Sequence, residues 1–203
     1  MKISPLLLAI ACSFAFAAQD PVALLKKNDT ELQIALKKKS HTPKDIENIK
    51  RLSSGLFDFA KMAERSLPKK TLEGLDSSQK ATFAKEFQRM IENSSVNKFK
   101  NTTFSASDST VYEEPKYKKD SAEVWVSIHS WSKGKDMLMV YKMDKSSALP
   151  GGKDSDGWRV WDLVIDDLST TKNYQDQFKS ILETKPFSEL IKIIKDKADE
   201  YEK

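Results

Sequence analysis

Residues 158–165, WRVWDLVI, carry apolar side chains at almost every position of a predicted β-strand. Strict alternation predicts one apolar set for each face: Trp158, Val160 and Val164 on the first, and Trp161, Leu163 and Ile165 on the second. A strand with one face in water alternates apolar with polar residues, so this strand must be covered on both sides. The rest of the chain therefore has to explain what covers the second face.

The first 17 residues are predicted to be a signal peptide and no part of the fold. Lys2 gives a positive start, PLLLAIACSFAF is a short apolar run, and residues 15–17 form a small-x-small cleavage site. Cys12, the only cysteine, would leave with this segment. Its alternative role as a lipid attachment site requires a polar segment after it, where apolar SFAFAA stands instead. We therefore expect an exported chain in which residues 18–203 form one domain without disulfides.

Amphipathic helical patterns fill the first half and the end of the chain. Capping residues or Pro at the first helical position mark three starts, at Asp20-Pro21, Thr42-Pro43 and Asp76-Ser77. The second of these helices is predicted to run without a break to Pro68. Two more helices are predicted near the C-terminal end, capped by Ser169 and Ser188.

Between these helical regions lie segments rich in β-branched and aromatic residues, at 102–112, 121–131, 136–143 and 157–166. The connections between them are short, which favours antiparallel pairing. The order of helices, sheet and helices predicts an α+β fold, with a twisted antiparallel sheet of about four strands and helices packed around it.

Residues suited to catalysis are few. The two histidines, His41 and His129, stand in no recognisable motif, and no Gly-rich phosphate loop precedes a helix. The formal net charge of +4 is too small to indicate nucleic acid. The lysines are spread along helices, which is typical of a solvated face, although weak attraction to anionic lipid headgroups is an alternative.

Three carboxylates at 162, 166 and 167 allow two interpretations. Asp162 interrupts the apolar strand and could be a general acid or base with a raised pKa. The structural alternative pairs Asp162 with Arg159 or Arg89, and places Asp166 and Asp167 at a helix N-terminus, where anions are favoured. We favour the structural interpretation.

The choice of apolar side chains in the sheet is unusual. One face of DMLMVYKM carries Met137, Met139, Tyr141 and Met143, and the preceding strand places Trp125 and Trp131 on one of its own faces. Methionine is flexible and polarizable, which suits a surface that fits variable apolar shapes. An ordinary core gives the same pattern, so composition alone leaves both open.

The segment GWRVWDLVIDDLSTTKNYQDQFKSIL resembles the C-terminal part of the MlaC, or toluene-tolerance, family of periplasmic phospholipid carriers. The family pattern is matched in step by Trp158, Val160, Asp162, Ser169, Asn173, Tyr174, Gln177, Phe178 and Leu182. Three further segments, LFDFAKMAERSL, LDSSQKATFAKEFQRMI and ELIKIIKDK, resemble the family in the same order. The chain departs from it at Gln175, where Arg is usual, and at Pro68 and Asp167, where Gly is common. Contacts made by that Arg cannot be transferred.

The resemblance implies an apolar cleft between the sheet and the helices that holds the acyl chains of a glycerophospholipid. Such a carrier works in the periplasm between an outer-membrane Mla lipoprotein and porin complex and an inner-membrane MCE-domain protein with its ABC transporter. It maintains outer-membrane lipid asymmetry, with the lipid as cargo and no cofactor, metal or nucleic acid. The apolar positions on the matching segments give the expected lipid contacts: Phe57, Phe59, Met62, Phe83, Phe87, Met90, Trp125, Met137, Met139, Tyr141, Leu163, Ile165, Tyr174 and Phe178.

Two alternatives stay open. The chain could bind another apolar small molecule in the same cleft. It could also be an enzyme similar to isomerases or dehydratases on a related cone-shaped α+β fold, and Asp162 with His129 is then the candidate polar pair.

Overall fold

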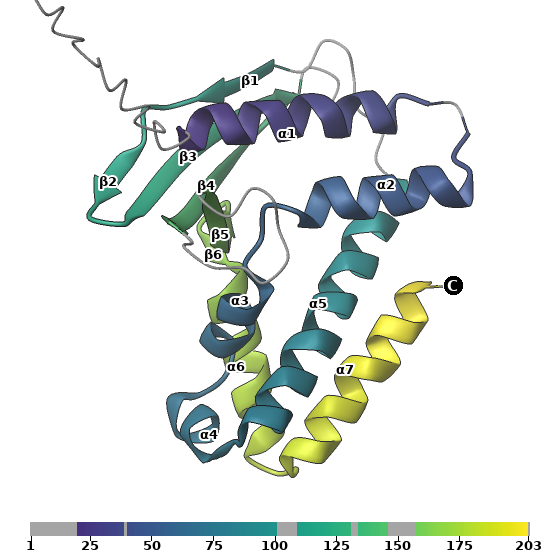
Figure 1. Cartoon of the computed structure of the whole chain (residues 1–203), viewed down its shortest axis with the longest axis vertical. Helices are drawn as coiled ribbons and strands as arrows, with labels where there is room; N and C mark the ends of the chain where they lie inside the picture. Colours follow the sequence, from purple (N-terminus) through teal and green to yellow (C-terminus); the bar gives the residue numbers. More distant parts are fainter. Residues whose placement is uncertain (1–19, 39, 101–108, 131–133, 146–156, 203) are drawn as a thin grey trace, which may run out of the picture.

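The computed structural model describes residues 20–38, 40–100, 109–130, 134–145 and 157–202. Within these ranges, no helix combines the length and the apolar character needed to cross a bilayer. The described chain forms an antiparallel sheet at one end and a group of helices at the other, with α1 lying across the sheet (Figure 1). This confirms the α+β class predicted from the sequence.

Seven helices lie within the described ranges: α1 (Pro21–Leu36), α2 (Pro43–Ser54), α3 (Phe59–Arg65), α4 (Lys69–Gly74), α5 (Ser77–Lys100), α6 (Thr170–Leu182) and α7 (Phe187–Glu202). The predicted caps Asp20, Thr42 and Ser169 are confirmed. For example, the Asp20 carboxylate accepts from the Val22 and Ala23 N–H groups at 3.3 and 3.1 Å. The predicted cap at Ser188 is wrong, because α7 already begins at Phe187.

The predicted continuous helix from Thr42 to Pro68 is also wrong. It divides into α2 and α3, and residues 56–58 between them run beside a sheet strand. The Asp58 N–H donates to the Val160 carbonyl, and the Val160 N–H donates to the Leu56 carbonyl, both at 2.8 Å. Asp58 then caps α3 by accepting from the Lys61 N–H at 2.9 Å. Pairing with the sheet thus overrides the local helical pattern.

The sheet has six described strands: β1 (Ser109–Tyr112), β2 (Lys116–Lys118), β3 (Ser121–Ser130), β4 (Lys135–Lys145), β5 (Trp158–Ile165) and β6 (Leu168–Ser169). Their order is β1-β3-β4-β5-β6, with β2 also paired to β3. The predicted count of about four was too low, because β2 and β6 are three and two residues long and too short to show an alternation. Part of the predicted strand 102–112 and Trp131 lie outside the described residues.

A β-bulge in β5 changes which side chains share a face. Lys142 of β4 pairs with Asp162, and the next residue, Met143, pairs with Val160, so Trp161 is the extra residue. The prediction of strict alternation is therefore wrong: Leu163 lies on the same face as Val160, and Trp161 lies opposite. We call the face with Val160 the inner face; it carries Ala122, Val124, Val126, Ile128, Met137, Met139, Tyr141, Met143, Trp158, Val160, Leu163 and Ile165. The opposite face is the outer face.

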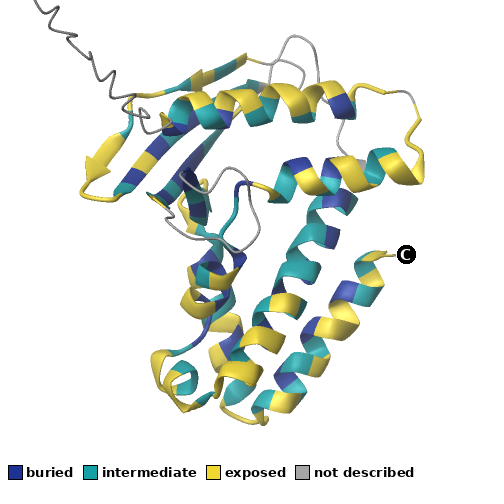
Figure 2. Cartoon of the chain, viewed as in Figure 1, coloured by how far each residue is buried: buried dark blue, intermediate teal, exposed yellow. Residues whose placement is uncertain are grey.

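Buried residues form two main clusters (Figure 2). The sheet core joins the inner face to Leu25 of α1 and to Leu56. The helical core lies between α3, α5, α6 and α7, and its buried members are Phe59, Met62, Ala63, Leu67, Phe83, Phe87, Met90, Phe178, Leu190, Ile194 and Ala198. A smaller cluster around Ile49 and Leu52 joins α2 to α1 and α5. Helix α1 therefore covers part of the inner face, and most of the helical core forms a separate cluster.

Candidate functional site

Burial of the inner face decreases along the strands. At one end Met143 and Val160 are 0% exposed. Further along, Met139 is 9% exposed, and at the far end Ile165 is 36% exposed. The side chains remain apolar throughout, and Ile128, Met137 and Leu163 near this end are only partly buried. An apolar surface thus runs from the sheet core out to solvent. We call its five outermost residues the apolar ramp: the buried Met139, the partly buried Ile128, Met137 and Leu163, and the exposed Ile165.

Helix α1 provides the cover at the buried end. Leu25 is fully buried against the inner face, with Val22 and Leu24 packed beside it. A polar contact fixes the same helix, because the Tyr112 hydroxyl donates to the Asp29 carboxylate. Burial raises the pKa of Asp29 above its ordinary value, against the Tyr112 hydrogen bond, which lowers it. The helix is therefore held over the sheet by one apolar and one polar anchor.

The fourteen residues predicted from the sequence do not gather in one place. Seven lie in or against the helical core: Phe59, Met62, Phe83, Phe87, Met90, Tyr174 and Phe178. Four belong to the sheet core or pack against it from the inner face: Met137, Met139, Tyr141 and Leu163. Phe57 packs against both clusters, Ile165 ends the ramp, and Trp125 lies on the outer face.

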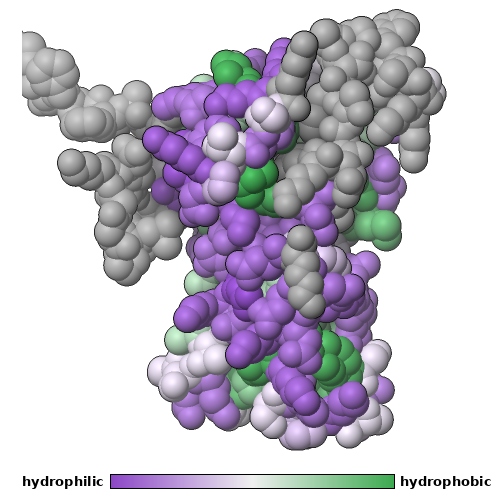
Figure 3. Space-filling view, turned by 90° about the vertical axis from the view of Figure 1, so that its right-hand side faces the viewer, coloured by the Kyte–Doolittle hydropathy of each residue, from purple (hydrophilic) through white to green (hydrophobic). Residues whose placement is uncertain are grey.

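The aromatic members of the helical core are packed on one another. Phe83 and Phe87 are 1% and 0% exposed. The Phe87 ring meets the Tyr174 ring edge-on at 5.2 Å between centroids, and Phe83 meets Phe178 edge-on at 5.7 Å. These rings fill the space between α5 and α6. On the side that Figure 3 presents, the described residues are mostly hydrophilic and show separate apolar patches.

Two inner-face residues were missed from the sequence. Ile128 follows from the alternation of β3, which places it with Val124 and Val126. Leu168 on β6 pairs directly with Ile165 and is 68% exposed. Nothing in the sequence marks Leu168, because a two-residue strand carries no periodic signal.

Asp162 is a structural junction in this fold. Its carboxylate accepts from the Ser169 hydroxyl at 2.8 Å and the Thr171 N–H at 3.0 Å, and Lys142 Nζ lies 3.3 Å away. The predicted pairing with an arginine is wrong: Arg89 contacts acidic residues of α7, and Lys142 takes that place beside Asp162. The buried carboxylate thereby joins β5 to the start of α6.

The polar pair of the enzyme hypothesis is not brought together. Asp162 pairs across the strands with Lys142, whereas His129 pairs with Asp136, six residues along β4. At about 3.3 Å per residue, the two side chains stand about 20 Å apart. Within the described ranges, no group of three or more His, Cys, Asp or Glu is placed to hold a metal ion.

Asp166 and Asp167 occupy a turn between β5 and β6. Their φ angles are 45° and 66°, the left-handed values of a tight hairpin turn, which Asp tolerates better than most residues. The prediction that they lie at a helix N-terminus is wrong, because Ser169 stands there. Its hydroxyl accepts from the Lys172 N–H at 3.1 Å.

A small cavity of about 150 Å³ lies between α3, α4 and α5, lined by four alanines with Glu64, Leu67, Leu72, Lys80 and Phe83. This volume is below the range of about 300–1,000 Å³ that small-molecule pockets occupy. This cavity is therefore too small to hold a ligand of lipid size.

Comparison with known proteins agrees with this architecture. A phospholipid-binding protein from Ralstonia solanacearum, solved in complex with a phospholipid, is similar with a TM-score of 0.70 and 16% identity, over 91% of this chain and 100% of that chain. At this identity the similarity shows the fold. A comparison with curated protein sequences finds no match. The family model described as MlaC protein matches residues 26–196, so the chain belongs to the MlaC family.

Proposed function

We propose that the protein is a periplasmic carrier that holds a glycerophospholipid with its acyl chains along the inner face of the sheet. Membership of the MlaC family supports a role in phospholipid binding. The similar fold of the Ralstonia solanacearum protein, which was solved with a phospholipid, supports the same ligand class.

The observation that carries the proposal is the apolar ramp. An ordinary core ends where its cover ends, and the side chains beyond it become polar. Here Met137, Leu163 and Ile165 stay apolar although they are only partly buried or exposed, on a face shared with fully buried residues. Hydrocarbon laid along these side chains would continue the core outward.

We place the acyl chains against Ile128, Met137, Met139, Tyr141, Leu163 and Ile165, with Phe57 at the border of the helical core. Contact of the chains with the seven helical residues stays a prediction. Those residues already contact one another, so a chain could reach them only if α5 and α6 separated.

The energetics suit a carrier. Burying an acyl chain contributes about 0.8 kcal/mol per methylene, so two chains approach about 20 kcal/mol relative to water. This is near the ceiling of non-covalent binding, and release into water would be extremely slow. A bilayer offers the same burial, so transfer is close to balanced when the carrier docks on a partner that continues the apolar path.

We further propose that the partners are those of the Mla system: the outer-membrane lipoprotein and porin complex, and the inner-membrane MCE-domain protein with its ABC transporter. The cycle would maintain outer-membrane lipid asymmetry without covalent chemistry. The separation of Asp162 from His129 by six residue positions along the sheet argues against the isomerase or dehydratase alternative.

Mass spectrometry of solvent extracts tests the ligand. Protein produced in a Gram-negative host and purified without detergent should release about one phospholipid per chain. Recovery of a quinone or another apolar molecule in that amount would favour the alternative apolar binder. Recovery of no apolar molecule from folded protein would refute the carrier proposal.

A further inference from the structure

The outer face carries a second pocket, away from the apolar ramp, whose lining includes four charged side chains. It has a volume of about 340 Å³ and is lined by Lys116, Tyr117, Lys118, Ser121, Ala122, Glu123, Lys142, Met143 and Trp161. Ala122 and Met143 point their side chains to the inner face and are buried there, so they contribute main chain to the pocket floor. The walls are formed by the outer-face side chains.

These side chains come into register from four strands. Lys116 of β2 pairs with Glu123 of β3, which pairs with Lys142 of β4, which pairs with Asp162 of β5. Cation and anion thus alternate across one row of the sheet. Lys142 Nζ lies 3.3 Å from the buried Asp162 carboxylate, which offsets its charge. The electrostatic potential of the pocket therefore depends mainly on Lys116 and Lys118 of β2.

Neither Lys116 nor Lys118 forms an ion pair with any residue in the described ranges. Lys116 Nζ instead lies 4.4 Å from the centroid of the Trp125 ring. A contact with an aromatic ring holds a cation in place without neutralising it, so Lys116 keeps its charge and N–H donors for an anion.

One further lining group defines the ligand. Glu123 places a carboxylate acceptor among the lysines. A bare anion would be repelled by this carboxylate, whereas a ligand with a hydroxyl group next to its charge could donate to it.

We propose that the outer-face pocket binds a phosphate ester that carries a free hydroxyl group, with the phosphate on Lys116 and Lys118 and the hydroxyl on Glu123. A phospholipid headgroup with a glycerol end and a soluble polyol phosphate share this chemistry. The proposal does not depend on lipid carriage by the inner face, because the two faces are separated by the sheet.

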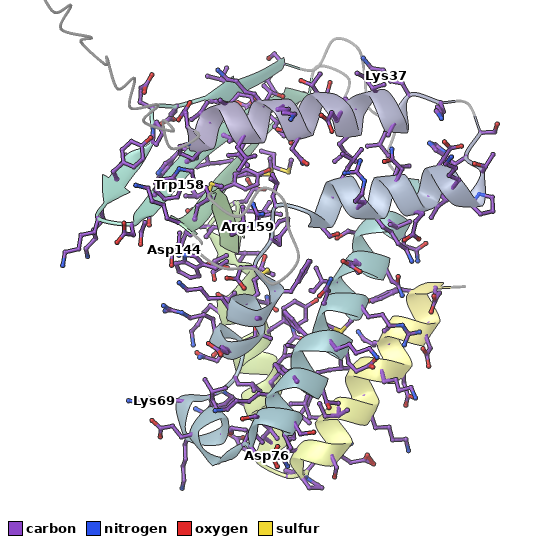
Figure 4. All side chains as sticks on the ribbon, viewed as in Figure 1. Lys37, Lys69, Asp76, Asp144, Trp158 and Arg159 are labelled. Atoms are coloured by element: carbon purple, nitrogen blue, oxygen red, sulfur yellow. The ribbon has the colours of Figure 1, made fainter. Side chains whose placement is uncertain are left out.

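The test compares two double variants that remove the same charge. Lys116→Gln with Lys118→Gln alters the pocket, and Lys69→Gln with Lys70→Gln alters α4. Figure 4 shows Lys69 at the far end of the molecule from Asp144 and Arg159, which mark the paired ends of β4 and β5 near the pocket. All four lysines are exposed, so both variants should fold as the wild type does.

Each protein is titrated with sn-glycerol 3-phosphate by calorimetry, and with vesicles of phosphatidylglycerol in phosphatidylcholine by co-sedimentation. We expect the pocket variant to lose about 30-fold in affinity for at least one probe, corresponding to about 1 kcal/mol per lysine, while the α4 variant stays within about threefold of the wild type. Binding of vesicles alone identifies a headgroup, and binding of the soluble ester identifies a free metabolite.

The proposal is overturned if the wild type binds neither probe, or if both variants lose affinity equally, which would indicate non-specific attraction by net charge. Phospholipid co-purified with each variant is measured in parallel and should be unchanged. If the wild type carries the normal amount of lipid but binds neither probe, only the pocket proposal fails. If it binds a probe but carries no lipid, only the carrier proposal fails.

Discussion

Replacing Ile165 with Glu tests the apolar ramp at its most exposed residue. Ile165 is 36% exposed and pairs with Met139 on the inner face. With strands about 4.8 Å apart and side chains of one face about 6.6 Å apart, each inner-face residue presents about 30 Å² to a ligand. An acyl chain in contact with this residue buries an equal area of its own, so the substitution removes about 60 Å² of apolar contact. At 25 cal/mol per Å², the lost binding free energy is about 1.5 kcal/mol. We therefore expect at least a tenfold loss of lipid affinity.

Since absolute affinity is too high to titrate, the assay is competitive. Wild type and variant with different affinity tags are incubated with less phospholipid than total protein, separated, and extracted. The Ile165→Glu protein should hold at most about one tenth of the lipid held by the wild type. The matched control is Val111→Glu, an apolar strand residue on the outer face that is 60% exposed, and it should share lipid equally. Equal sharing by Ile165→Glu, or equal loss by Val111→Glu, would refute the reasoning.

Three further substitutions test the framework around the ramp by urea unfolding. Phe87→Ala should lower the free energy of unfolding by about 3–5 kcal/mol, as for a packed core ring; a loss below about 1 kcal/mol would mean that the helical core has room for a ligand. Asp162→Ala should cost about 3–5 kcal/mol by leaving the Thr171 N–H and Lys142 without their partner, and a neutral effect would contradict the junction. Burial raises the folded pKa of Asp29 above 3.8, so the contribution of Asp29 to stability should fall as pH rises from 3.8 through the raised pKa. The stability of the wild type relative to Asp29→Asn should therefore decrease over this range, and parallel pH profiles would contradict the burial.

Much of the fold could be predicted because local signals and tertiary structure agree. Asp20, Thr42 and Ser169 cap their helices as their sequence context indicates, and the four residues Met137 to Met143 at alternate positions share the inner face. The failures occur where a tertiary contact overrides a local pattern. Residues 56–58 are not helical because they pair with Val160, and no local sequence pattern predicts that pairing.

The sequence named four of the five residues of the apolar ramp but grouped them with residues of the helical core, for a related reason. Apolar periodicity identifies residues that are buried but does not say against what, so Phe83 and Phe87 of the helical core entered the same set as Met137 and Leu163 of the sheet. The bulge at Trp161 then exchanged the faces of the residues that follow it. The sequence of a strand that is apolar on both faces does not reveal a single inserted residue, because the residues after it can be assigned to either face of the sheet.

Photo-crosslinking tests the central claim most directly. A phospholipid with a diazirine in its acyl chain is loaded onto the protein and irradiated, and the modified residues are mapped by mass spectrometry. The account predicts modification of the inner face, at Ile128, Met137, Met139, Leu163 and Ile165. Modification confined to Phe83, Phe87 and Phe178 of the helical core, or to the outer face, would contradict it.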